Sequence, residues 1–219
     1  ENERLLQRAR EMCTAAIAED PSAPMSYLYD GLISSLRLSR IRDHVEDANE
    51  RVRLVERAKS RGAEAYRNAA RVATTPEQRV YALNGIAYLL VKTSNIYVDA
   101  AADPKCADEK EDYQREAVDL LASARQEIHR AEASAGAIDP IVLTTQADIE
   151  ILGLQFQDPE DPQEKYRQIL ELLGNAVEYG YTGYSGSRES FFEKRPHFRY
   201  LAKLNPDYEE DVCRVVQIR

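Results

Sequence analysis

The sequence has few cysteines and no long apolar run. A membrane-spanning helix needs about 18 uninterrupted apolar residues. No stretch of this 219-residue sequence approaches that length, so the membrane is not expected as a partner. Cys13, Cys106 and Cys213 are odd in number and about a hundred residues apart, which fits neither a disulfide framework nor a metal knuckle. This cysteine usage is typical of a reducing, intracellular setting, and we expect a cytoplasmic protein.

Catalytic and cofactor-binding motifs are also missing from the sequence. His44, His129 and His197 are far apart and form no His-x3-His or HExxH pattern, so a metal site is not predicted. Residues 183–187, GYSGS, do not form a nucleophile elbow because Ser187 replaces the last glycine. The glycines of this segment do not have the spacing of a dinucleotide fingerprint either. We therefore predict a protein that is not an enzyme and that uses no cofactor.

Charge is unevenly distributed along an acidic chain with a formal net charge of -9. Residues 99–165 hold 17 acidic and 6 basic side chains, whereas residues 37–67 hold 9 basic and 6 acidic ones. Because affinity for nucleic acid depends mainly on Lys and Arg that neutralise phosphates, the acidic balance disfavours a nucleic-acid partner. It permits a basic protein partner, although solubility alone also explains the excess of acid.

Apolar residues recur at steps of three and four along nearly the whole chain, which predicts helices. The longest such stripe comprises Val45, Ala48, Val52, Val55, Lys59, Gly62, Tyr66, Ala69 and Ala73, and only Lys59 interrupts it. No comparable stretch alternates at period two, so strands are not expected. The predicted fold class is therefore all-α.

Capping signals mark where the predicted helices begin. Thr75 and Asp161 each precede a proline and a capping-box Gln or Glu, and Asp20, Asp139 and Asn205 also precede prolines. We expect helices near residues 3–19, 24–40, 45–73, 77–98, 108–134, 141–156, 163–179, 188–194, 197–204 and 207–216. The connections are short, so sequential helices should be antiparallel neighbours, and the absence of a linker predicts a single domain over 1–219.

One pair of residues recurs within the first half of the chain. Tyr27 stands four residues before Gly31, and 54 residues later Tyr81 stands four residues before Gly85. In both cases the pair lies in an apolar helical run that begins just after a proline. A glycine at this place lets a neighbouring helix approach closely, and the preceding ring can cover it. The recurrence therefore indicates stacked helix pairs.

Together with Tyr88, and with Ala124, Ile128 and Ala131 of a later helix, this pattern resembles the tetratricopeptide repeat. The spacing of 54 residues exceeds the family's repeat of about 34, so the helices or their loops are longer than usual. The resemblance implies a right-handed superhelix of about nine or ten helices, with repeats over residues 1–186. A helical end cap over 187–219 would cover the apolar face of the last repeat.

The resemblance also implies a concave groove lined by the first helix of each pair. The family's groove positions, carried over onto this sequence, are mostly apolar: Met25, Leu28, Leu32, Ser35, Leu36, Arg79, Ala82, Ile86, Leu89 and Leu90. The Lys/Asn set with which some members clamp a terminal carboxylate is absent from them. What is implied is a non-catalytic scaffold that binds a partner's peptide or helix. Because the chain does not begin with Met, we expect it to be part of a larger bacterial protein or complex.

Two further segments are candidate contact sites. Arg53, Arg57 and Arg61 step by four along the predicted 45–73 helix, and like charges at this interval repel, which favours a partner acid. The acidic segment 99–165 or an external anion could supply it, and a solvated helix face is the alternative.

The second segment is a loop rich in glycine and tyrosine before the predicted cap. Its Tyr179, Tyr181 and Tyr184 could stack on a ligand or pack against the last repeat. A ligand- or nucleotide-sensing regulatory domain of a signalling or defence effector would use this loop. A non-repeating helical bundle that forms a homo-oligomer is the third alternative.

Overall fold

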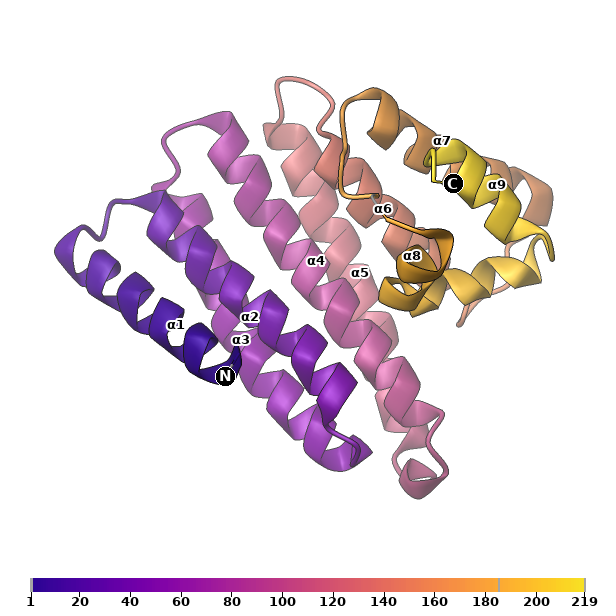
Figure 1. Cartoon of the computed structure of the whole chain (residues 1–219), viewed down its shortest axis with the longest axis horizontal. Helices are drawn as coiled ribbons and strands as arrows, with labels where there is room; N and C mark the ends of the chain where they lie inside the picture. Colours follow the sequence, from indigo (N-terminus) through magenta and orange to yellow (C-terminus); the bar gives the residue numbers. More distant parts are fainter. Residues whose placement is uncertain (1, 185, 219) are drawn as a thin grey trace. The chain divides into compact units, whose positions relative to one another are not determined.

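The computed structural model describes residues 2–184 and 186–218, and every regular element in these ranges is helical (Figure 1). This confirms the all-α prediction. The elements are α1 (Asn2–Glu19), α2 (Pro24–His44), α3 (Ala48–Val72), α4 (Pro76–Ala101), η1 (Pro104–Cys106), α5 (Lys110–Ser134), α6 (Pro140–Gly153), α7 (Pro162–Glu178), α8 (Arg188–Lys194), η2 (Pro196–Lys203) and α9 (Tyr208–Val215). Each expected helix is present, although the one near 197–204 is a 3-10 helix, and the short η1 was not foreseen.

Side-chain caps begin three of the helices at the predicted positions. Thr75 and Asp161 each accept a hydrogen bond from the backbone N–H three residues later, and Asp139 accepts one from the N–H two residues later. Asp20 has another role, because its carboxylate accepts bonds from the backbone N–H and the hydroxyl of Ser22. It therefore stabilises the turn before α2 and does not cap that helix.

The chain divides into two compact units, residues 1–136 and 137–219. The first contains α1 to α5 with η1, and the second contains α6 to α9 with η2. In the second unit α6 packs against η2, and α7 packs against α9. The predicted division places α6 and α7 in the repeats and η2 and α9 in the end cap, so helices from both parts lie together in this unit. The single domain and the superhelix stay predictions.

In the first unit, small residues lie where helices come closest. α2 packs on α3, α3 on α4 and α4 on α5, while α2 also contacts α1 and α4. A Cβ atom at Gly31 would lie 2.7 Å from the ring of Tyr66, and one at Gly85 would lie 2.5 Å from it. One α3 ring therefore packs against glycines of both α2 and α4. The two tyrosines that precede these glycines differ in exposure, because Tyr27 is buried whereas 43% of the Tyr81 surface is exposed.

The second unit has an aromatic core. Phe191 and Phe198 are fully buried, and their ring centroids are 5.3 Å apart in an edge-to-face arrangement. The buried Ile149, Ile151 and Leu152 of α6 supply further apolar surface. Rings from α8 and η2 thus provide much of the volume that this unit buries.

Candidate functional site

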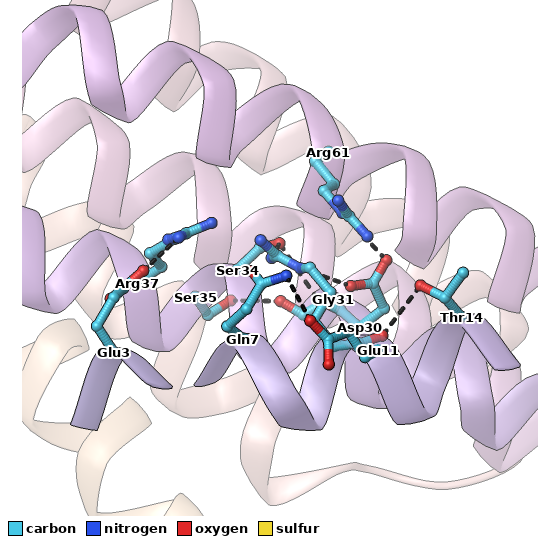
Figure 2. A network of polar contacts seen from close by, with 11 residues as sticks. Glu3, Gln7, Glu11, Thr14, Asp30, Gly31, Ser34, Ser35, Arg37 and Arg61 are labelled. Atoms are coloured by element: carbon cyan, nitrogen blue, oxygen red, sulfur yellow. Dashed lines mark hydrogen bonds and ion pairs between the residues drawn. The ribbon is translucent and has the colours of Figure 1, made fainter. Parts of the chain in front are cut away.

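A buried polar network joins α1, α2 and α3 (Figure 2). Arg10 of α1 donates hydrogen bonds to the Asp30 carboxylate over 3.2 Å and to the Ser34 hydroxyl over 3.0 Å. The other carboxylate oxygen of Asp30 lies 3.5 Å from Nε of Arg61 in α3. Asp30 and Ser34 are one turn apart on α2, and such residues face the same side of a helix. The Asp30 carboxylate therefore links guanidinium groups from two helices.

Positive charge exceeds negative charge around this network. Only 6% of the Arg10 surface is exposed, and burial lowers the pKa of its guanidinium. The neighbouring Arg61 and Arg37 charges lower that pKa further, against the opposite effect of Asp30. A buried charge is stable only when it is paired, so removal of Asp30 would leave Arg10 in an unfavourable environment.

A cavity of about 540 Å³ opens beside the network between α1, α2 and α3. Its lining contains five arginines, and we call it the arginine cavity: Arg10, Arg37, Arg40, Arg57 and Arg61. The rest of the lining is Glu3, Ile41, His44, Val45, Leu54 and Ala58. Guanidinium groups form paired hydrogen bonds with phosphate and carboxylate oxygens, so the lining suits an anion.

Glu3 of α1 partly neutralises the arginine cavity. It forms an ion pair with Arg37, and its second oxygen lies 3.6 Å from Nη1 of Arg40. That Nη1 is buried and has no hydrogen bond among the described residues. Arg57 has neither a hydrogen bond nor an ion pair in the part of the chain that the structure describes, and it is exposed.

The structure separates the three arginines predicted as an anion row. Arg53 lies 3.8 Å from Glu50 on its own helix, whereas Arg57 and Arg61 line the arginine cavity. The acidic segment 99–165 contributes the carboxylate of Glu116. This carboxylate lies 3.5 Å from the ammonium group of Lys59 and pairs with it rather than with the predicted arginine row. The expected partner acid for Arg61 is instead Asp30, an aspartate of α2 that lies outside the acidic segment.

The predicted groove residues do not form one accessible surface. Five of them are buried in the first unit and belong to its core: Leu28, Ser35, Ala82, Ile86 and Leu89. Their assignment to a partner-binding groove is corrected, because α2 and α4 are covered on several sides by neighbouring helices. Met25, Leu32 and Leu36 are exposed, and Leu90 is half-buried. Arg79 is exposed but lines a different cavity, together with Arg67, Arg71 and Arg130.

Three tyrosines that the groove prediction left out are exposed on α2 and α4. They are Tyr29, Tyr81 and Tyr88, with 54%, 43% and 36% of their surfaces accessible. The ammonium group of Lys92 lies 4.7 Å from the centroid of the Tyr88 ring and donates a hydrogen bond to Ser39 of α2 over 2.6 Å. Lys92 thus connects the exposed side of α4 with that of α2. The recurrence of tyrosines one turn from each glycine could not have identified this surface, because Tyr27 is buried whereas its counterpart Tyr81 is exposed.

The three tyrosines of the glycine-rich segment have different environments. Tyr179 is 51% exposed, whereas Tyr184 is buried and packs edge to face on Tyr181 and Phe191. The guanidinium of Arg195 lies 5.0 Å from the centroid of the Tyr184 ring. Burial raises the pKa of the Tyr184 hydroxyl. Tyr184 therefore belongs to the core of the second unit, and its assignment as a contact residue is corrected.

The described residues contain no group of three or more His, Cys, Asp or Glu side chains placed to hold a metal ion. Cys13, Cys106 and Cys213 are free thiols. Among the described helices, none combines the length and the apolar character needed to cross a membrane.

The fold and the site define an all-α protein whose first unit contains an arginine-lined cavity. A comparison with protein-family models, curated proteins and solved structures finds no significant match. The resemblance to the tetratricopeptide repeat therefore stays a prediction.

Proposed function

We propose that the first unit is a non-catalytic interaction module that binds a helix of a partner protein through the exposed side of α2 and α4. The observation that supports this is a row of large apolar side chains left in solvent, which we call the α2–α4 face: Met25, Tyr29, Leu32, Leu36, Tyr81 and Tyr88. Contiguous exposed apolar surface is characteristic of interaction sites, and tyrosines often supply much of the binding energy.

The spacing within the α2–α4 face favours a helical partner. Along α2 the exposed residues follow one another at steps of four, three and four, so they form one stripe along the helix. A partner helix with apolar residues at the same period can lie along this stripe and against Tyr81 and Tyr88. Lys92 lies beside Tyr88 and would favour an acidic residue at that end of the partner.

The test is selection of helical peptides from a random amphipathic library, followed by titration calorimetry. We expect Leu36→Asp to weaken binding by about 2 kcal/mol, or roughly thirtyfold, because it buries a charge in the contact. Val118→Asp is the matched control, since Val118 is an equally exposed apolar residue on α5. It should leave the affinity unchanged.

Circular dichroism establishes that both variants keep their helix content. Peptides that bind Leu36→Asp as well as the wild type would contradict the α2–α4 face as the binding surface. If instead the protein forms a dimer that Leu36→Asp converts to a monomer in sedimentation analysis, the partner helix belongs to a second copy of the chain.

A further inference from the structure

The charges of the arginine cavity do not balance. Its lining holds five guanidinium groups and the single carboxylate of Glu3. Asp30 is not part of the lining but pairs with Arg10 and Arg61. This excess of positive charge occurs in a chain whose formal net charge is -9. Burial has the largest effect on the pKa of Arg10 and lowers it, and the charges of Arg61 and Arg37 lower it further. Like charges this close repel one another, so a bound anion would be favourable here.

Two of these arginines have unused hydrogen-bond donors. Nη1 of Arg40 is buried and forms no hydrogen bond among the described residues, although Glu3 lies 3.6 Å away, and the exposed Arg57 contacts no carboxylate of the described chain. A buried donor without a hydrogen bond is destabilising, so an acceptor at this place would stabilise the protein. The unused donors lie on α2 and α3, which places them on two walls of the same cavity.

One arginine of the cavity is already held in position. Arg10 is fixed by hydrogen bonds to Asp30 and Ser34. A ligand would therefore need to order fewer side chains, and this reduces the entropic cost of binding.

We propose that the arginine cavity binds a small organic molecule that carries two or more linked phosphate groups. A single carboxylate would leave most of the excess charge unbalanced, whereas a diphosphate or triphosphate matches it and accepts paired hydrogen bonds from several guanidinium groups. The cavity volume of about 540 Å³ is that of a small-molecule site, which is typically about 300–1,000 Å³. Ile41, Val45 and Leu54 form an apolar wall for the organic part.

A nucleic acid fits this site less well than a small phosphorylated molecule. A polyanion needs a continuous basic surface, whereas the chain as a whole is acidic, and the cavity lined by Arg67, Arg71, Arg79 and Arg130 shares no residue with the arginine cavity. Glu3 has the role of an internal competitor, because it contacts two of the guanidinium groups that a phosphate would use. Removal of its charge should therefore strengthen binding.

The experiment is titration calorimetry of the full chain at physiological ionic strength, without divalent cations. The probes are ATP, inorganic triphosphate and adenosine. We expect saturable one-to-one binding of ATP and of triphosphate, with ATP tighter because its organic part contacts the apolar wall, and no binding of adenosine. Equal affinities for the two phosphate probes would overturn the organic part of the proposal, and no binding of either would overturn all of it.

Charge variants locate the site. Arg40→Ala/Arg57→Ala should weaken ATP binding by at least about tenfold, and Glu3→Gln should strengthen it several-fold. The matched control is Arg67→Ala/Arg71→Ala, which removes the same charge from the second arginine-lined cavity of the first unit. It should change the affinity by less than about threefold, as expected for long-range electrostatics under salt screening.

The results also separate this proposal from a general affinity for anions. An equal loss of affinity in both double variants, or a loss only in Arg67→Ala/Arg71→Ala, would overturn the assignment to the arginine cavity. Tighter binding of polyglutamate or of single-stranded RNA than of ATP would overturn the ligand class. The α2–α4 face is intact in all these variants, so the outcome does not depend on the function proposed above.

Discussion

In the first unit the ring of Tyr66 packs against Gly31 and Gly85, whereas in the second unit Phe191 packs edge to face on Phe198 and on Tyr184. The first arrangement depends on the absence of side chains from two helices, which lets α2 and α4 approach α3. The second depends on rings that fill the space among short helices. Long helices can bury surface along their length, whereas short ones need large side chains to bury a comparable area.

The largest effect is expected from Phe191→Ala in the second unit. It should reduce the free energy of unfolding by about 3–5 kcal/mol, because it removes a fully buried ring and leaves a cavity. Denaturant unfolding with hydrogen exchange, which assigns the loss to α6–α9, measures this. Phe192→Ala is the control and should cost clearly less, since Phe192 is only partly buried. Equal losses would contradict the aromatic core.

A smaller effect is expected at alkaline pH in the first unit. Burial raises the pKa of the Tyr66 hydroxyl from 10.0 to about 12. A raised pKa means that the folded state keeps the hydroxyl proton of Tyr66 up to a higher pH than the unfolded chain does. The contribution of the neutral hydroxyl to the free energy of unfolding is therefore fully present below pH 10. It is lost as the pH rises towards 12, and the loss amounts to about 2–3 kcal/mol.

Tyr66→Phe tests this prediction, because phenylalanine has no hydroxyl to ionise. Its unfolding free energy should fall less than that of the wild type between pH 10 and pH 12, as measured by urea denaturation at each pH. Parallel curves for the two proteins would show that Tyr66 is not the buried group that the packing indicates.

The smallest effects concern glycines of the two units. Gly85→Ala should destabilise the protein by about 1–3 kcal/mol, because its methyl group would meet the Tyr66 ring. Gly174→Ala in α7 should instead stabilise the protein by about 0.5–1 kcal/mol. The added Cβ atom would lie 3.4 Å from Val215, which leaves room for it, and alanine favours a helix.

A double-mutant cycle locates the cause of the Gly85 effect. With Tyr66→Leu as background, the cost of Gly85→Ala should decrease, because the smaller side chain leaves room for the methyl group. If the cost is the same in both backgrounds, the close approach of Tyr66 is not what requires glycine at this position.

Local features of the fold could be predicted from the sequence, whereas exposure could not. The caps at Thr75 and Asp161 and the period of α3 depend on residues within one or two turns, so they are visible in the chain itself. The resemblance to the tetratricopeptide repeat implies groove positions for Ile86 and Leu89, but neighbouring helices bury them. Periodicity identifies the faces of a helix, but it does not show how many of those faces are covered.

The helices, several of their starting points and the small residues at helix contacts can be read from the chain, because these follow from the period of 3.6 residues and from backbone hydrogen bonding. Which residues meet at a site depends on how the helices pack. Arg10, Arg37 and Arg57 belong to three different helices, and no spacing in the chain relates them. They come together because the burial of apolar faces orders α1, α2 and α3 side by side, and this packing also concentrates the arginine charges around one cavity.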